Sequence, residues 1–433
     1  MTMDPSATPG RSTMRQAMSR FQKCLSVTLL SSALLATIAP VTAQTTSPPA
    51  QAETPANYVF PELPPNVTTF SNKLVSVRIG FIVLADYTFV HQNSSSIEQV
   101  GPQASKGDLR AGRLAFSGEF KFKSPWTYMI AADYNELRQP EDQIFEGVDV
   151  YLTIPLWGAA SVKIGKQKET FVYEMIGDAA NLPQQERILS PFFVTRNIGI
   201  RYLDNYLKDR MLFSIGIFND WFRSDRSFAD SGTQVSGRLT GLPLFSTDGR
   251  EFLHLGVGFR YVGADSGEMR YKGRPESNVI DYYVDTDTFP AKYAKQLGLE
   301  ALYNTGPFSV LTEYAQAWVE SPETGNPGFS GSYVTGSYVL TGETRPYDKK
   351  VGYARRVIPT ARWGALELVG RFGYVNLDDT LIKGGKLAKW YAGMNWWASR
   401  QWKLSMGYGL GDLDRFDTTG RTQMLFTRLQ WIY

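Results

Sequence analysis

The chain has 433 residues, of which 43% are hydrophobic, 13% aromatic and 20% charged, and it contains a single cysteine. One cysteine excludes a disulfide scaffold and a cysteine-based metal site. Ten Trp, 25 Phe and 23 Tyr supply enough apolar surface to exclude a disordered chain. The single long apolar run is too short to cross a bilayer, which excludes a helical membrane protein.

The first 43 residues predict a cleaved signal peptide. Four basic residues precede an apolar stretch from Leu25 to Ile38, and a small-residue exit ends at Ala43. A short membrane anchor is the alternative, but no stop-transfer charge cluster follows the apolar stretch. Removing residues 1–43 takes four of the 45 basic and one of the 42 acidic residues, which leaves 41 of each. Net charge therefore gives no reason to expect nucleic-acid binding.

Residues 44–70 are rich in Pro, Thr and Ala and predict an extended periplasmic lead-in. From residue 71 to 433 apolar and polar side chains alternate, which is the period of a β-strand. In the first such segment Val77, Ile79 and Phe81 share one face, and Arg78 and Gly80 share the other. The expected strands lie near residues 73–91, 108–123, 126–136, 146–154, 160–169, 194–203, 210–219, 233–242, 251–262, 293–304, 307–320, 329–342, 362–377, 387–399, 401–413 and 421–433.

A soluble β-sandwich also alternates in this way. Two features favour a membrane barrel instead: the polar face carries isolated charges and glycines on strand after strand, and aromatic residues gather near strand ends. In lipid only a closed barrel satisfies every backbone group. We therefore predict an all-β fold, a sixteen-stranded antiparallel transmembrane β-barrel with an aqueous channel, after a cleaved signal peptide.

The connections between the expected strands differ in length. Residues 124–125, 305–306 and 399–400 form tight turns, which are typical of the periplasmic side. Long connections, expected outside the cell, span residues 93–107, 170–193, 220–232 and 263–291. The segment 343–361 is the exception, because it is long and yet lies on the side of the short turns.

Several segments together resemble one known family. They are VKIGKQKETF (162–171), the Glu186-Arg187 segment, SGRLTGLPLF with the later LHLG, GRPES (273–277), GPFSVLTEY (306–314), LTGETRPYD (340–348) and the C-terminal LQWIY. In this order they resemble the phosphate-selective porin O and P family, over most of residues 71–433. The resemblance implies a homotrimeric porin in the outer membrane of a Gram-negative bacterium, surrounded by outer-membrane lipid and lipopolysaccharide.

The same resemblance implies passage of phosphate or related small inorganic anions, with loops folded into the barrel. The inward third loop is residues 170–193 and the fifth loop is residues 263–291. Members of the family have varied substrates, so a sugar, an aromatic acid or weakly selective diffusion stays open. Lumen aromatics such as Tyr151, Tyr391 and Trp397 would suit such solutes.

An anion filter needs Lys and Arg on the lumen face or on an inward loop. Guanidinium groups match phosphate oxygens as a fork, and Lys acts as a point charge. By strand parity the lumen candidates are Arg113, Lys121, Lys163, Arg201, Arg238, Arg260 and Arg371. Arg110 joins Arg113 near the outer end of the second strand, where the family carries a basic cluster. In the fifth loop Arg270, Lys272 and Arg274 alternate, so an extended segment would aim them one way.

Acidic residues on the same parity count against a uniform anion field. They are Asp133, Asp149, Glu300, Glu313 and Glu367, and each candidate cation could simply be a barrel charge balanced by one of them. In the third loop we expect Glu174, Asp178 and Glu186 to hold the segment against wall arginines. An external cap is the alternative for that loop.

Catalysis has little support in the sequence. The two histidines, His91 and His254, are far apart and lack a metal-ligand spacing. The chain contains no P-loop motif for nucleotide phosphates, no dinucleotide-binding GxGxxG motif and no EF-hand calcium motif. We therefore expect no enzyme and no cofactor, although an outer-membrane hydrolase using Ser94–Ser96 and His91 is a rival. A structural or adhesin barrel with a blocked lumen is the more serious alternative.

Overall fold

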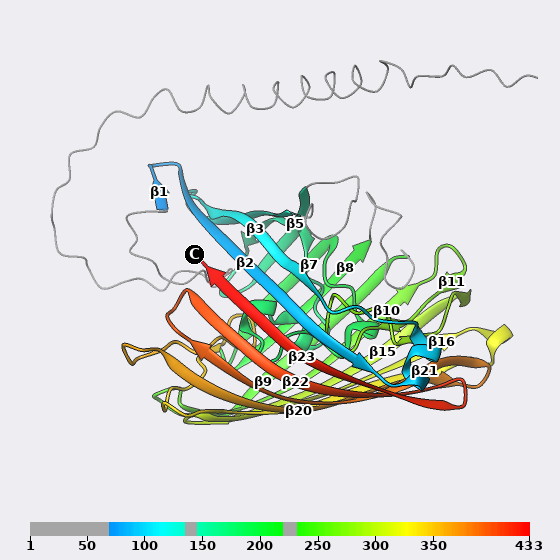
Figure 1. The fold of residues 1–433 in the computed structure, drawn as a ribbon. Coiled ribbons are helices and arrows are strands. Elements are labelled where there is room, and N and C mark those ends of the chain that lie inside the picture. Colours follow the sequence, from blue (N-terminus) through cyan, green and yellow to red (C-terminus); the bar gives the residue numbers. More distant parts are fainter. Residues whose placement is uncertain (1–68, 135–144, 220–231) are drawn as a thin grey trace, which may run out of the picture. The chain divides into compact units, whose positions relative to one another are not determined.

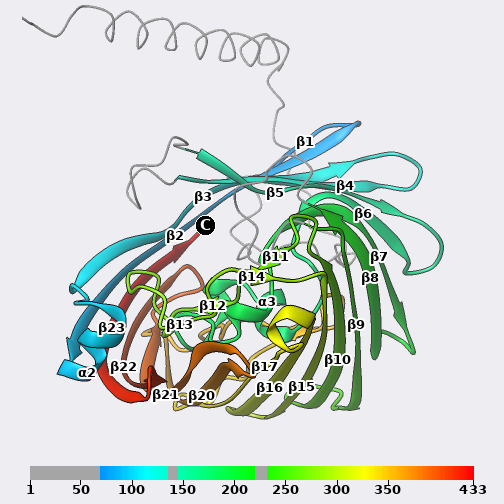
Figure 2. The same cartoon turned by 90° about the vertical axis from the view of Figure 1, so that its right-hand side faces the viewer.

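Sixteen long strands close into one antiparallel barrel (Figures 1 and 2). This is a computed structural model, and it describes residues 69–134, 145–219 and 232–433. Each long strand pairs with its neighbours in the chain, and β23 (Thr418–Ile432) pairs with β2 (Val75–Gln92) to close the sheet. The predicted all-β fold and its strand number are confirmed. In the described residues no helix is long and apolar enough to cross a membrane.

The strand bounds lie close to the predicted ones. Between β2 and β23 the wall consists of β3 (Lys106–Phe120), β4 (Trp126–Tyr134), β5 (Phe145–Pro155), β6 (Ser161–Gln167), β7 (Asn197–Tyr206), β8 (Met211–Asn219), β9 (Gln234–Phe245), β10 (Glu251–Gly263), β15 (Tyr293–Thr305), β16 (Phe308–Glu320), β17 (Gly328–Val339), β20 (Ala365–Asp379), β21 (Ile382–Trp397) and β22 (Trp402–Arg415). A short strand, β1 (Thr69–Ser71), pairs with the start of β2, so the sheet begins two residues before the expected residue 71. The predicted leader, nearly all of the lead-in, residues 135–136 and most of 220–232 lie outside the described residues.

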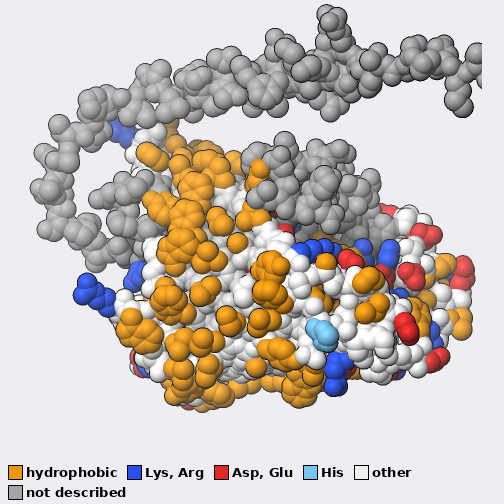
Figure 3. Space-filling view, in the orientation of Figure 1, with side chains coloured by type: hydrophobic (Ala, Val, Ile, Leu, Met, Phe, Trp, Pro, Cys, Tyr) orange, Lys and Arg blue, Asp and Glu red, His pale blue; other side chains and the backbone are white. Residues whose placement is uncertain are grey.

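The period-two pattern sorts side chains between lipid and lumen. Phe81, Ile130 and Leu255 are exposed on the outer wall, whereas His254 and Arg428 are buried inside. Figure 3 shows hydrophobic side chains over the wall around β2 and β23, with charged side chains gathered towards the end that carries the helix α2 (Ser94–Val100). This outward apolar surface is the one that a bilayer requires.

The third loop folds into the barrel, as predicted, and is not an external cap. It contains the helix α3 (Tyr173–Ile176) and two 3₁₀ turns, η1 (Ala179–Asn181) and η2 (Ser190–Phe192). Most of its apolar side chains are buried, with Phe171, Met175 and Leu189 at 0% exposure. In Figure 2, which looks into the barrel, α3 lies inside the ring of strands.

The fifth loop also lies inside the ring of strands (Figure 2). It forms two small hairpins from β11 (Glu268–Met269), β12 (Lys272–Gly273), β13 (Val284–Asp285) and β14 (Phe289–Pro290). Its Tyr271 packs against Phe192 of the third loop with ring centroids 6.3 Å apart, and both rings are fully buried. The two loops thus share one hydrophobic core within the barrel.

The long connection between β17 and β20, residues 340–364, enters the barrel from the periplasmic end. It carries a small hairpin, β18 (Tyr347–Asp348) with β19 (Tyr353–Ala354). Tyr353 is 3% exposed and Val357 is 0% exposed. The length of this connection is explained by its inward course, since a surface turn needs only a few residues.

Candidate functional site: a basic pocket between the wall and the third loop

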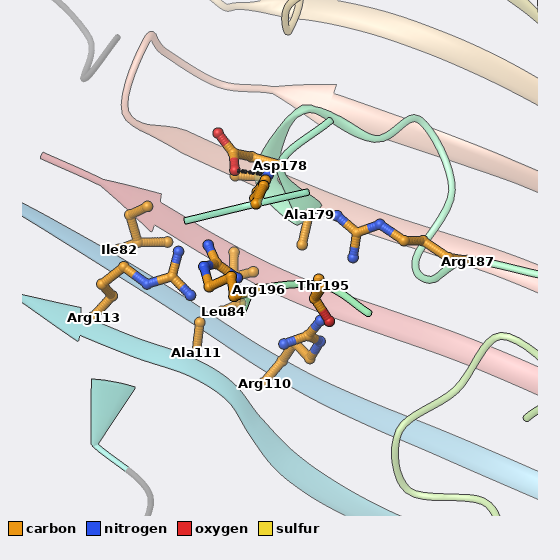
Figure 4. A pocket seen from close by; sticks show the side chains of 12 residues that line it. Ile82, Leu84, Arg110, Ala111, Arg113, Asp178, Ala179, Arg187, Thr195 and Arg196 are labelled. Carbon is orange, nitrogen blue, oxygen red and sulfur yellow. Dashed lines mark hydrogen bonds and ion pairs between the residues drawn. The ribbon is translucent and has the colours of Figure 1, made fainter. Parts of the chain in front are cut away.

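A pocket lies where the third loop faces strands β2 and β3. Its lining comes from the wall and from the ends of the loop, and it consists of Ile82, Leu84, Arg110, Ala111, Arg113, Lys168, Asp178, Ala179, Ala180, Arg187, Thr195 and Arg196. Figure 4 shows Arg110 and Arg113 reaching in from β3, with Arg187 coming from the third loop and Arg196 from the position just before β7. Five basic side chains and one carboxylate therefore line this pocket.

A β-bulge turns both arginines of β3 towards the lumen. Leu84 pairs with Ala111 and Ala85 with Leu109, so Arg110 is an extra residue in its strand. A bulge of this kind shifts side-chain parity by one position. Arg110 and Arg113, three residues apart, can then share the lumen face, and the structure brings these two predicted residues together.

Each basic group of the pocket has a carboxylate nearby. Arg110 lies 2.5 Å from Glu186, Arg113 lies 2.7 Å from Asp133 and Arg196 lies 2.8 Å from Asp149. Lys168 pairs with Asp178 at 2.5 Å. Asp133 and Asp149, which counted against an anion field in the sequence, are thus neutralised within ion pairs.

Wall arginines anchor the third loop at two of the three expected points. Glu186 bonds Arg110 and, at 3.0 Å, Arg428 of β23, while Glu174 of α3 bonds Arg371 of β20 at 2.6 Å. The expectation for Asp178 was wrong, because its partner is Lys168, which lies between β6 and the loop. The third loop is therefore anchored to the wall both at Glu174 and at Glu186.

Burial and neighbouring charges shift the pKa values of the loop groups. Burial would raise the pKa of Glu186, but the charges of Arg110 and Arg428 outweigh it and hold the pKa at about 2. Burial lowers the pKa of Lys168 to about 8, although Asp178 partly offsets the effect. At neutral pH the pocket therefore keeps an ionised Glu186, and Lys168 is close to its titration range.

Lys163 and Arg201 extend the basic surface onto β6 and β7. They are directly paired in the strand register, so their side chains share the lumen face. Lys163 Nζ lies 3.8 Å from the centre of the Tyr151 ring, and Arg201 bonds the Lys168 carbonyl at 3.4 Å. Within the described part of the chain neither cation has a carboxylate at ion-pair distance, and the Arg201 Nε is buried without a hydrogen bond.

The whole basic region carries a surplus of positive charge. We define the basic cluster as the five pocket cations with Lys163, Arg201 and Arg428, together with the carboxylates Asp86, Asp133, Asp149, Asp178 and Glu186. Eight basic groups face five acidic groups, which is a formal surplus of three basic groups. Among the described residues no group of three or more His, Cys, Asp or Glu side chains could hold a metal ion.

The other predicted lumen cations belong to the filled part of the barrel. Arg238 bonds Glu300 at 2.6 Å, Arg260 bonds Glu169 at 2.8 Å and both guanidinium groups are buried. Arg371 is enclosed between Glu174 and Glu276. The structure places these three arginines on the lumen face, as parity predicted, but they stand in buried ion pairs away from the pocket.

The remaining candidates lie at the two ends of the barrel. Lys121 follows the last residue of β3 and donates to Ser71 Oγ at 2.6 Å, so it is at the periplasmic rim and not beside the pocket. In the fifth loop Arg270 pairs with Asp285 at 2.5 Å. Lys272 and Arg274 both lie over the ring of Tyr282, at 4.3 and 4.5 Å.

Four basic residues of the cluster were not among the predicted candidates: Lys168, Arg187, Arg196 and Arg428. Arg428 lies on the lumen parity of the last strand, so the rule that found Arg201 could have found it. Arg187 was noted only as part of a family-like segment, and Arg196 precedes the regular part of β7. For these two the sequence offers no parity signal, because they belong to an irregular loop.

A family model settles the kinship of this chain. The model of the phosphate-selective porin O and P family matches residues 87–433. The chain belongs to this family. This porin is accordingly a channel in the outer membrane of a Gram-negative bacterium.

Solved porins share the fold at low sequence identity. OmpT of Vibrio cholerae has a TM-score of 0.52 with 11% identity, and the match covers 84% of this porin and 100% of OmpT. The anion-selective porin of Comamonas acidovorans gives 0.52 and 12%, with 82% and 100% covered, and OmpF of Salmonella typhi gives 0.53 and 10%, with 84% and 100% covered. A Caulobacter vibrioides protein is 30% identical over 174 residues, which are 38% of this porin and 35% of that protein.

Proposed function

We propose that this porin is a passive diffusion channel for small inorganic anions, with phosphate or polyphosphate as the preferred solute. The observation that carries the proposal is the charge surplus of the basic cluster beside the third loop. A ring of Lys and Arg in a narrow, partly desolvated passage attracts anions and repels cations. The near-neutral mature chain gives no such field, so local placement of charge is what matters.

The packing of the loops supports a passage along the basic cluster. The hydrophobic core formed by the third and fifth loops includes side chains of β10, β15, β16 and β20, such as Val262, Ala294, Ala315 and Val369. Close-packed side chains leave no room for a hydrated ion. Solutes therefore pass on the opposite side, where Arg113, Lys163 and Arg201 face the lumen.

Phosphate suits this arrangement better than chloride does. A guanidinium group can bond two phosphate oxygens at once, and several pocket arginines converge from different elements. A doubly charged anion also gains more than a monovalent one from the same charge surplus. The anion-selective porin of Comamonas acidovorans has the same fold, which supports an anion channel without naming its solute.

Reconstitution in a planar bilayer tests this function. The reversal potential in a KCl gradient is expected to show chloride preference, and millimolar phosphate is expected to reduce the chloride current. A cation-preferring reversal potential would overturn anion selectivity. Chloride preference without phosphate block would keep an anion channel and remove the phosphate assignment.

A channel for another solute is the second candidate, and Tyr151 is the observation in its favour. Its ring lies under Lys163 at the basic cluster, where it could stack on an aromatic acid. Tyr391 and Trp397 give no such support, because they are 6% and 1% exposed. Current block by benzoate but not by phosphate would favour this candidate, and absence of any conductance would favour a structural barrel.

We also propose how the chain is processed and how it assembles. Residues 1–43 are a removable signal peptide, residues 44–70 a periplasmic lead-in, and three barrels form a homotrimer in contact with lipid and lipopolysaccharide. A trimer form of V. cholerae OmpT is consistent with the trimer. No enzymatic activity and no cofactor are expected. N-terminal sequencing of the exported protein and its native mass test the cleavage and the trimer.

A further inference from the structure

The periplasmic turn, residues 340–364, reaches the third loop in the interior of the barrel. Asn181 of the third loop donates to Tyr353 Oη at 2.9 Å, and the backbone N–H of Ala354 donates to Tyr173 Oη at 2.8 Å. Arg345 donates to the Asn181 carbonyl at 3.1 Å. Because residues 178–180 line the pocket, these bonds bring the turn next to the site from the periplasmic side.

Wall residues hold the turn in this inward position. Arg345 bonds Glu367 of β20 at 2.5 Å, and Arg238 of β9 donates to the Gly352 carbonyl at 2.6 Å. Tyr347 Oη lies 2.6 Å from His254 Nδ1. Buried hydrogen bonds to charged groups are among the stronger contacts in a protein. The turn is therefore a fixed part of the interior.

The turn carries two adjacent arginines that differ in their partners. Arg355 is bonded to Asp348 of the same turn at 2.8 Å. Arg356 is 8% exposed, and among the described residues it has no hydrogen bond, ion pair or ring contact. A buried cation without a carboxylate is costly, and such a group commonly marks a site for an anion.

Arg356 lies within electrostatic range of the pocket, although it is not one of the residues that line it. The charges that act on it include Asp178, which lines the pocket, and Arg400 of the turn between β21 and β22. Burial lowers the pKa of Arg356 to about 10, with Arg355 acting in the same direction. The guanidinium group therefore stays positive at neutral pH. Arg356 belongs to the turn that enters from the periplasmic end, whereas Arg110 lies on β3 and Arg187 on the third loop.

We propose that Arg356 is an anion-binding residue of the passage, supplied from the periplasmic end by the inward-folded turn. An anion that leaves the basic cluster meets Arg356 before it reaches the periplasm. Arg356 adds a positive charge within electrostatic range of Asp178, whose carboxylate is already paired with Lys168. This inference rests on the proposed anion channel and adds a residue to it.

Neutralising Arg356 tests the proposal in the reconstituted porin. Arg356→Gln is expected to lower the anion-to-cation permeability ratio about two- to fourfold, which is the effect of one unit charge a few ångströms from the ion in a water-like medium. Arg362→Gln removes the same charge from an exposed position of the same turn and is expected to leave the ratio unchanged. Arg356→Lys keeps the charge and is expected to retain most of the preference, which also controls for folding.

Chemical modification gives a second readout on the same residue. The single cysteine of the chain is Cys24, which lies in the predicted leader, so Arg356→Cys would introduce the one thiol of the mature protein. A cationic methanethiosulfonate reagent is expected to restore anion preference, and an anionic reagent to lower it further. Both reagents are expected to react faster from the periplasmic side.

The outcomes separate this inference from the proposed function. A wild-type channel without anion preference would refute the proposed function and this inference with it. An anion-selective wild type with an unchanged Arg356→Gln variant would refute the role of Arg356 alone. Equal losses in Arg356→Gln and Arg362→Gln would also refute it, because the effect would then come from the general charge of the turn.

Discussion

Lys163 and Arg201 are directly opposite each other on β6 and β7, with both side chains on the lumen face. Like charges in this position destabilise a sheet by about 0.2–1 kcal/mol. Stability alone would favour an opposite charge or a neutral residue in one of the two positions.

Neutralising one member of this pair is expected to separate function from stability. Lys163→Gln removes a cation from the passage, so the anion-to-cation permeability ratio is expected to fall about twofold or more. The same change relieves repulsion with Arg201, so resistance to thermal unfolding is expected to stay equal or rise. Reversal potentials and heat-modified gel mobility measure the two effects, and Lys123→Gln at the exposed periplasmic end is the charge-matched control. A loss of stability together with unchanged selectivity would contradict this role.

The selectivity of the wild-type channel is expected to depend on pH near 8. Lys168 has a pKa lowered to about 8 by burial, and it loses its positive charge as the pH rises through that value. Asp178 remains ionised, so the pocket becomes less positive and anion preference is expected to fall between pH 7 and pH 9. In Lys168→Arg the charge persists over this range and the fall is expected to disappear. A decline of the same size in Lys168→Arg would assign the titration to another group.

Glu186 is expected to control both the position of the third loop and the charge of the pocket. It bonds Arg110 at 2.5 Å and Arg428 at 3.0 Å. Glu186→Gln leaves two arginines with less compensation, so anion preference is expected to rise. The loop also loses an ionic anchor that is worth about 3 kcal/mol when buried, so single-channel conductance is expected to become larger or noisier. Gln185→Glu, two residues from Arg187 on the same loop, is the opposite change and is expected to weaken anion preference.

The carboxyl of Glu186 predicts a further effect at low pH. Its pKa lies at about 2, below the ordinary value of about 4.3 in an unfolded chain. The stabilising contribution of this group is therefore present above about pH 4 and is lost as the pH falls towards 2. Loop docking, followed by proteolysis or conductance noise, is expected to hold at pH 5 and to weaken at pH 2–3. Glu186→Gln is expected to show no such change.

The three basic residues of the fifth loop are expected to differ in their contribution to anion selectivity. Neutralising Arg270, Lys272 and Arg274 together is expected to lower the permeability ratio for anions. Arg270→Gln alone is expected to contribute little, because Arg270 is 41% exposed and already paired with Asp285. Lys272 and Arg274, which share the ring of Tyr282, are expected to account for most of the effect. An unchanged reversal potential in the triple variant would remove the fifth loop from the filter.

The sequence by itself determined the barrel, because the alternation of side chains along a strand is a local property. Val77, Ile79 and Phe81 show the period of two without any knowledge of their neighbours, and the same rule placed Arg201 and Arg238 on the lumen face. The unusual length of residues 343–361 was visible as well. The bulge that turns Arg110 inward was not, because it depends on the register between two strands.

Only the tertiary structure decided which lumen cations remain available to an ion. Arg371 finds its partner Glu174 across 197 positions of sequence, and Arg428 finds Asp86 across 342. Parity places a side chain on a face but cannot say which loop later covers it or which carboxylate neutralises it. Glu174 belongs to a loop that folds back into the barrel, whereas Asp86 lies opposite Arg428 on the neighbouring strand β2. Hence Arg238 and Arg371 end in buried ion pairs, while Lys163, Arg201 and Arg356 have no carboxylate at ion-pair distance among the described residues.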